Sequence, residues 1–124
     1  MYNIYYTLIM KTIVNKAWGS FEIINEGEKY TVKKLIVIPG GQLSLQSHEH
    51  RSEHWIIAKG NAEVIINDET FYLHENQHIF IPKGAKHRLA NRAEQTLVVV
   101  EMWFGDNLNE NDIKRYEDIY NRGS

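Results

Sequence analysis

The stretch GGQLSLQSHEHRSEHWIIAKG, from Gly40 to Gly60, concentrates side chains that could bind a ligand, namely Gln46, His48, His50, Glu53 and His54. Successive side chains of an extended strand alternate between its two faces, so Gln46 and His48 point the same way. The run from Glu53 to Ala58 alternates in the same manner. If the chain doubles back around residues 49–52, donors from both runs converge on one point.

A second stretch offers one more donor. Pro82-Lys83-Gly84 predicts a tight turn, because proline fixes φ before the bend and glycine permits the bend itself. His87 follows this turn by three residues and opens another strand-like run that ends near Asn91. We expect His87 to join the donors of the first stretch.

The spacing in both stretches resembles the two motifs of the cupin family. Gly40, five residues, Gln46-x-His48, four residues, Glu53, six residues and Gly60 is similar to the first motif. Pro-x-Gly-x-x-His-x-x-x-Asn, from Pro82 to Asn91, is similar to the second. The segments LSLQSHEHRSEHW, ENQHIFIP, HRLAN and NDIKRYEDIY resemble the C-terminal cupin domain of type II mannose-6-phosphate isomerases, and this resemblance covers residues 15–122.

The resemblance implies a metal site formed by Gln46, His48, Glu53 and His87. Pairing His48 with His50 instead would leave two residues before Glu53 and seven after Gly40, which departs from the family spacing. The Gln-x-His form also resembles the zinc site of type I mannose-6-phosphate isomerases. Nitrogen, carboxylate and amide donors suit Zn²⁺, and also Mn²⁺, Co²⁺, Fe²⁺ or Ni²⁺.

The resemblance further implies interconversion of mannose 6-phosphate and fructose 6-phosphate, a reaction of mannose and GDP-mannose metabolism. This reaction needs a group that carries a proton and a cation that binds phosphate. Lys33, His50 and Glu101 are the candidate proton carriers. Lys33 could equally be solvated, and Glu101 could equally be exposed at a sheet edge. The candidate phosphate-binding residue is Arg115, with Arg51 and Arg88 beside the motifs as further candidates.

Composition narrows the class of protein. The 124 residues are 43% hydrophobic and 24% charged, which is typical of one globular domain. A net charge of −2 offers no basic field for nucleic acid or anionic lipid. The absence of cysteine excludes disulfides, thiolate metal sites and cysteine nucleophiles. The first ten residues, MYNIYYTLIM, have neither the basic flank nor the cleavage site of a signal peptide, so we expect a cytoplasmic protein.

Regular short strands separated by turn residues predict an all-β fold, and the motifs imply a cupin double-stranded β-helix, a form of the jelly roll. We expect an N-terminal arm or extra strand over residues 1–14 and a single cupin domain over 15–124. Spacing of three to four residues among Ile113, Tyr116 and Ile119 predicts a short C-terminal helix. Apolar surface in the arm and in the strand at 30–38 predicts a homodimer that pairs an edge strand.

Two functions from different classes fit these patterns. The first is a metal-dependent mannose-6-phosphate isomerase that works beside a separate guanylyltransferase, because the resembled domain follows such a domain in bifunctional enzymes. The second is a noncatalytic cupin that binds a sugar phosphate or a metal, since a fold does not fix a function.

Overall fold

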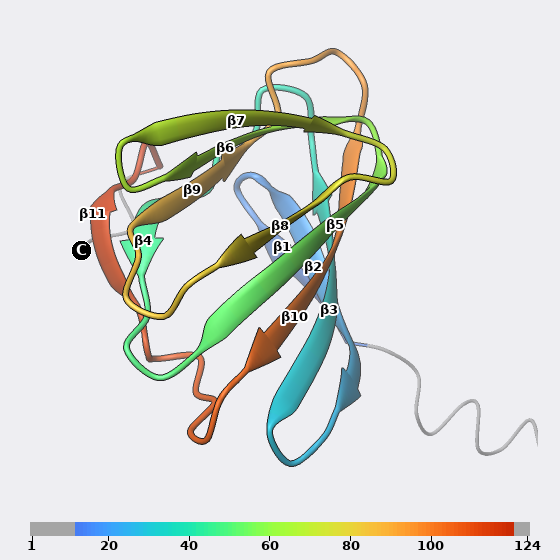
Figure 1. The fold of residues 1–124 in the computed structure, drawn as a ribbon. Coiled ribbons are helices and arrows are strands. Elements are labelled where there is room, and N and C mark those ends of the chain that lie inside the picture. Colours follow the sequence, from blue (N-terminus) through green and yellow to red (C-terminus); the bar gives the residue numbers. More distant parts are fainter. Residues whose placement is uncertain (1–11, 121–124) are drawn as a thin grey trace, which may run out of the picture.

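A computed structural model describes residues 12–120 of the chain, and these residues form two antiparallel β-sheets that face each other (Figure 1). The strands are β1 (Ile13–Lys16), β2 (Gly19–Glu26), β3 (Tyr30–Val37), β4 (Leu45–Ser47), β5 (Ser52–Lys59), β6 (Asn61–Ile66), β7 (Glu69–His74), β8 (His78–Ile81), β9 (His87–Ala90), β10 (Leu97–Phe104) and β11 (Lys114–Glu117). The six-stranded sheet has the order β1-β2-β3-β10-β5-β8, and the five-stranded sheet has the order β11-β4-β9-β6-β7.

The core lies between the sheets and follows from period-two alternation in the longest strands. In β3 and β10 every second residue is buried, which gives the inward faces Thr31, Lys33, Leu35 and Val37, and Leu97, Val99, Glu101 and Trp103. The apolar members contribute about 1.5–3 kcal/mol each when fully buried. Most of these inward residues are aliphatic or aromatic. The buried charged residues Lys33 and Glu101 are exceptions, which makes them candidates for a functional role.

Strand β3 lies between β2 and β10, in the interior of the larger sheet. It is therefore not an edge strand, and β1 and β8 form the two edges. Strand β1 pairs antiparallel with β2 through residues 13–16. The expected arm falls mostly on residues 1–11, which lie outside the described part of the chain.

The prediction of a C-terminal helix was wrong. Residues 114–117 form β11, which pairs with β4 and sets Arg115 opposite Gln46. The three-residue spacing of Ile113, Tyr116 and Ile119 suggested a helix, but a short segment gains more from backbone hydrogen bonds to a free sheet edge than from its weak helical periodicity.

Residues 12–120 contain no helix of the length and hydropathy that crossing a membrane requires.

Candidate metal centre and its pocket

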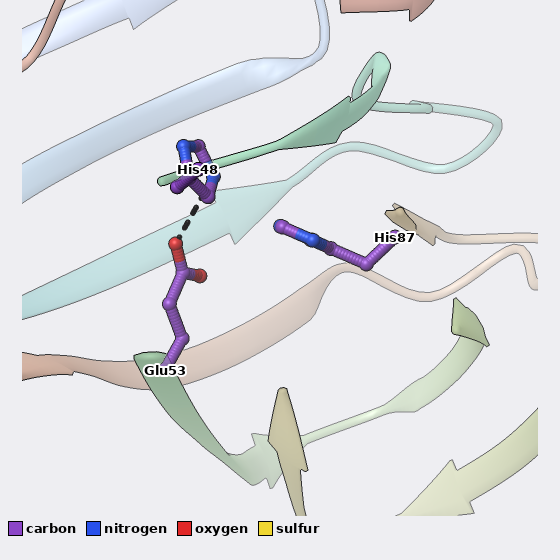
Figure 2. Close-up of side chains that lie close together, drawn as sticks. All are labelled: His48, Glu53 and His87. Atoms are coloured by element: carbon purple, nitrogen blue, oxygen red, sulfur yellow. Dashed lines mark ion pairs between the residues drawn. The ribbon is translucent and has the colours of Figure 1, made fainter. Parts of the chain in front are cut away.

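Three predicted donors come from strand ends in different sheets and meet inside the sandwich (Figure 2). His48 directly follows β4, His87 opens β9 in the same sheet, and Glu53 lies near the start of β5 in the opposite sheet. Strands β4 and β5 do not pair, so the loop between them crosses from one sheet to the other. All three residues are buried, and their candidate ligand atoms lie within 4.8 Å of one another.

Backbone carbonyls orient both histidines. The Nδ1 of His48 donates to the carbonyl oxygen of Asp112 at 2.6 Å, and the Nδ1 of His87 donates to that of Ala85 at 3.0 Å. A carbonyl oxygen only accepts, so each Nδ1 carries a proton, and in the neutral form of each ring the lone pair is on Nε2. Histidine ligands in metal sites usually have their second nitrogen held in this way.

Electrostatics keep the cluster in a form that can bind a cation. Burial lowers the pKa of His48 to about 4, and the charge of Arg51 acts in the same direction against the opposing charge of Glu53. Burial opposes ionisation of Glu53, but the charges of His87, Arg51 and His48 outweigh it and lower the pKa of Glu53 to about 2. At neutral pH the cluster therefore holds one carboxylate and a neutral His48. This donor chemistry fits a divalent metal ion.

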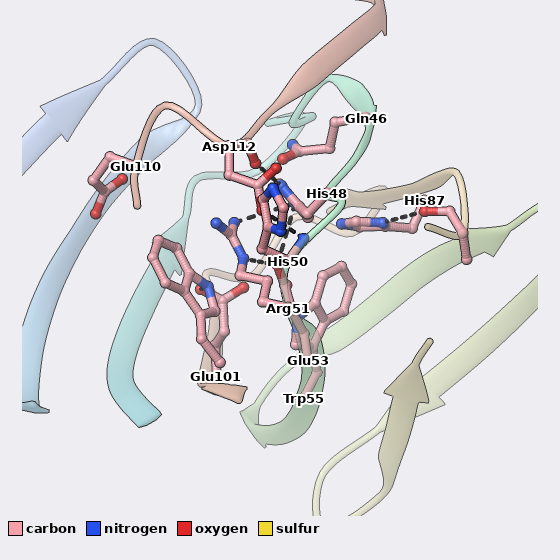
Figure 3. A network of polar contacts seen from close by, with 12 residues as sticks. Gln46, His48, His50, Arg51, Glu53, Trp55, His87, Glu101, Glu110 and Asp112 are labelled. Atoms are coloured by element: carbon pink, nitrogen blue, oxygen red, sulfur yellow. Dashed lines mark hydrogen bonds and ion pairs between the residues drawn. The ribbon is translucent and has the colours of Figure 1, made fainter. Parts of the chain in front are cut away.

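The fourth expected ligand, Gln46, lies beside the cluster (Figure 3). Its Nε2 donates to the carbonyl oxygen of Ser44 at 3.2 Å and to the Oγ of Ser44 at 3.1 Å. These bonds hold the amide nitrogen of Gln46 against Ser44, so Oε1 of Gln46 is the side-chain atom that could bind a cation. The assignment of Gln46 as a ligand stays a prediction.

A pocket lined by two of the three donors, Glu53 and His87, brings together most of the other predicted residues. Its charged lining consists of Lys16, Lys33, Arg51, Glu53, Glu101, Glu110 and Arg115, and its apolar wall includes Trp18, Phe21, Leu43, Leu89 and Ile113. Lys33 and Glu101 are buried in this lining rather than solvated or exposed at an edge. His50 is not part of the lining, because its half-exposed side chain lies over Glu49 on the outside of the loop.

Lys33 and Glu101 have specific partners in the pocket. The Nζ of Lys33 pairs with Glu110 Oε2 at 2.7 Å and lies 3.7 Å from the ring centroid of Trp103. The Nε1 of Trp103 donates to Glu101 Oε1 at 3.0 Å. Burial raises the pKa of Glu101 well above its ordinary value, and the charge of Glu53 and a hydrogen bond with Glu53 act in the same direction. Glu101 therefore holds its proton more strongly than an ordinary carboxyl group, and it lies beside Glu53, whose pKa is lowered.

Arg115 contributes an unusual feature to the pocket. Its Nε is buried and has no hydrogen-bond partner among the described residues. A buried donor without a partner is costly unless a ligand or water satisfies it. The same residue lines the pocket from β11.

Sequence reasoning undervalued three residues at this site: Arg51, Glu110 and Asp112. Arg51 was considered only for phosphate, yet its Nε donates to Glu53 Oε2 at 2.9 Å and its Nη2 lies 3.2 Å from His48 Nε2. Its guanidinium carbon also lies 3.4 Å from the ring centroid of Trp103. The position of Arg51 two residues before Glu53 was the available signal. Glu110 and Asp112 had no signal beyond the apparent start of a helix.

Two antiparallel sheets that enclose a buried His, Glu and His cluster define a cupin. The cupin-2 domain protein from Rhodospirillum rubrum superposes with a TM-score of 0.69 at 17% identity, over 82% of this chain and 78% of that protein. At this identity the likeness establishes the fold alone.

The family model described as "Mannose-6-phosphate isomerase C-terminal" matches residues 6–118. The chain belongs to this family. It is 46% identical over 109 residues to the alginate biosynthesis protein AlgA of Pseudomonas aeruginosa. It is 45% identical over 109 residues to the mannose-1-phosphate guanylyltransferase ManC of Salmonella typhimurium. In both cases the match covers 88% of this chain but 23% of the relative, so the chain spans about a quarter of the length of these relatives.

Proposed function

We propose that this domain is a metal-dependent isomerase that interconverts mannose 6-phosphate and fructose 6-phosphate. One observation carries the proposal: the pocket lined by Glu53 and His87 of the donor cluster also contains buried proton-carrying and cationic groups. The match to a mannose-6-phosphate isomerase family supports the choice of substrate.

His48, Glu53 and His87 would hold the metal ion through Nε2, a carboxylate oxygen and Nε2, with Gln46 as a fourth ligand. Zn²⁺ is our first choice among the divalent ions that this donor set accepts. When bound, such an ion polarises the oxygen atoms of a carbonyl or hydroxyl group. The apolar wall of the pocket would limit the access of water to the reacting carbons.

The remaining pocket residues have distinct roles in this proposal. Aldose to ketose isomerisation removes the proton from C2, delivers a proton to C1 and moves a second proton from O2 to O1. Lys33 and Glu101 are the two groups of the lining that could carry these protons, whereas His50 would have to reach inward from outside it. Arg115 would bind the phosphate, because the partnerless Nε in its guanidinium is suited to a phosphate oxygen.

A coupled assay tests this function. Purified protein with mannose 6-phosphate should yield fructose 6-phosphate when Zn²⁺, Co²⁺ or Mn²⁺ is present, and Lys33→Met and Glu101→Gln variants that retain metal should lose turnover. Arg115→Met should mainly raise KM for mannose 6-phosphate. Saturable binding of mannose 6-phosphate without turnover under every metal would instead support a noncatalytic binding domain.

Metal analysis of alanine variants tests the ligand set. Gln46→Ala, His48→Ala, Glu53→Ala and His87→Ala should each lower bound metal, while His50→Ala should retain it. Metal lost with His50→Ala but kept with Gln46→Ala would show that His48 and His50 form the pair.

The proposal extends to partners and place of action. The name of the relative ManC, a mannose-1-phosphate guanylyltransferase, supports a guanylyltransferase partner that acts on a phosphate of the same sugar. We infer a cytoplasmic location, because mannose 6-phosphate is charged and does not cross membranes unaided.

We also propose a homodimer through an edge strand of the larger sheet. Exposed apolar side chains on or beside that sheet support it, namely Ile38, Ile56, Phe80 and Phe104. Sedimentation at micromolar concentration that shows only monomer would contradict the dimer.

A further inference from the structure

The segment Asn109–Asp112, between β10 and β11, contacts the metal centre from outside the two motifs. Its clearest contacts belong to Asp112 (Figure 3). The carboxylate of Asp112 accepts from the backbone N–H of Glu49 through Oδ1 at 3.0 Å and from that of His50 through Oδ2 at 2.9 Å. Its carbonyl oxygen accepts from His48 Nδ1 at 2.6 Å. One residue therefore binds three consecutive residues of the loop that follows β4.

These contacts matter because the loop carries a ligand on an irregular backbone. His48 lies one residue beyond β4, and the loop runs from there across the sandwich to β5. No strand ladder holds Glu49 and His50, so the side-chain oxygens of Asp112 are the protein acceptors that order their amide groups. Asp112 does so with both oxygens, which fixes the path of the backbone that follows His48.

The same residue sets the chemical form of His48. Donation from Nδ1 to a carbonyl oxygen keeps the proton on Nδ1 and leaves Nε2, which lies 3.2 Å from Glu53 Oε2, with its lone pair. The other nitrogen of the ring could point toward Glu53 only after this bond broke. The contact thus decides which ring nitrogen is offered to a cation.

The neighbours of Asp112 support the same role. The carbonyl oxygen of Asn109 lies 3.5 Å from Arg51 Nη1, and Glu110 pairs with Lys33 at 2.7 Å. The segment therefore touches a ligand, its loop and both buried cations of the pocket. The segment lies more than 55 residues after Glu53 in the sequence, so neither motif includes it.

We propose that Asp112, which lies 64 residues after His48 in the sequence, is a positioning residue that holds His48 in its metal-binding geometry. This inference rests on the proposed metal centre. Asp112 touches no reacting atom in this account, and it acts through the loop and through the ring of His48. Loss of an outer-shell partner of a ligand typically weakens metal binding about 10- to 100-fold.

Three variants of the full chain separate this role from general stability. Asp112→Ala removes the carboxylate and keeps the backbone carbonyl. Asp112→Asn keeps one side-chain acceptor and should partly restore function. Asp106→Ala is the matched control, because Asp106 lies earlier in the same connection between β10 and β11, with a highly exposed side chain that pairs with Lys29 at 3.6 Å.

The experiment measures Zn²⁺ affinity by competition with a chromophoric chelator. Asp112→Ala should bind Zn²⁺ about 10- to 100-fold more weakly than the wild type, Asp112→Asn should fall between them, and Asp106→Ala should match the wild type. An affinity of Asp112→Ala within threefold of the wild type would overturn the proposal. So would an equal loss in Asp106→Ala, or an Asp112→Asn loss as large as that of Asp112→Ala.

A second measurement, on chelator-treated protein, tests the positioning role of Asp112 independently of whether the protein binds a metal. Long-range ¹H–¹⁵N spectra should show His48 as the Nδ1–H tautomer in the wild type, and amide exchange at Glu49 and His50 should be slow. Asp112→Ala should accelerate that exchange. A wild-type His48 in the Nε2–H tautomer would overturn the positioning role even if Asp112→Ala fails to fold. Wild-type protein that binds no metal but shows the expected tautomer and exchange would refute the metal centre alone.

Discussion

The ion pair between Arg51 and Glu53 should be the most strongly coupled contact of the site. Both side chains are almost fully buried, and Arg51 Nε lies 2.9 Å from Glu53 Oε2. Glu53 also accepts from Trp55 Nε1 at 2.9 Å. Glu53→Gln preserves an acceptor for Trp55 and removes the charge, while Arg51→Met preserves the aliphatic volume and removes the partner. Each single variant leaves one buried charge without its counterion.

Breaking a buried pair by removing one partner costs about 3–5 kcal/mol, so each single variant should lose that much free energy of unfolding. The double variant buries neither charge, and it should be about as stable as either single variant instead of losing the sum. The predicted coupling therefore equals the loss of one single variant, about 3–5 kcal/mol. Urea unfolding of all four proteins in the presence of a chelator measures this cycle, because the chelator removes any contribution from bound metal.

A surface pair provides the control for this cycle. Lys29 and Asp106 are exposed and lie 3.6 Å apart, so Lys29→Met should cost less than about 1 kcal/mol. Losses that simply add in the Arg51 and Glu53 double variant would refute the coupling. Single-variant losses as small as that of Lys29→Met would show that neither charge is held as the structure indicates.

Two further predictions concern pH and backbone conformation. Burial would raise the pKa of Asp112, but hydrogen bonds from the amides of Glu49 and His50 outweigh it, so the pKa lies below its ordinary value. The ionised carboxylate therefore stabilises the folded state above the unfolded pKa near 4, and this stabilisation is lost as pH falls through the folded pKa. Asp112→Asn should remove this part of the acid dependence in unfolding titrations. Gly60 has φ +86° and an added Cβ would lie 2.7 Å from the carbonyl oxygen of Thr96, whereas Gly84 has φ +83° with open space around it. Gly60→Ala should thus lose more stability in urea than Gly84→Ala, whose cost is the left-handed backbone alone at about 1 kcal/mol; equal losses would contradict this.

The fold could be predicted because its signals are local and repeated. Runs rich in β-branched residues predict the strands Tyr30–Val37 and Leu97–Phe104, and glycine and proline turns separate the strands. Both faces of Tyr30–Val37 are largely apolar, so the structure was needed to show which face is buried. The exception is the C-terminal segment, where β11 depends on the free edge of β4. A pairing between residues more than 65 positions apart leaves no trace in the periodicity of four residues.

The site was predictable where spacing defines it and unpredictable where distant segments complete it. Spacing within the two motifs brought His48, Glu53 and His87 together, as the structure shows. His50 was predicted as a candidate proton carrier, but it lies in a loop and outside the pocket lining. Asp112 belongs to neither motif, and its carboxylate accepts from the backbone amides of the loop at residues 49–50.

The most direct test of a metal-dependent isomerase is exchange of the C2 proton of mannose 6-phosphate with solvent. In D₂O, the protein with Zn²⁺, Co²⁺ or Mn²⁺ should incorporate deuterium at C2, chelation should abolish the incorporation, and restored metal should recover it. The His87→Ala variant, with its metal content measured in parallel, should show neither bound metal nor exchange. Exchange that survives complete chelation, or that is absent under every metal, would contradict the account.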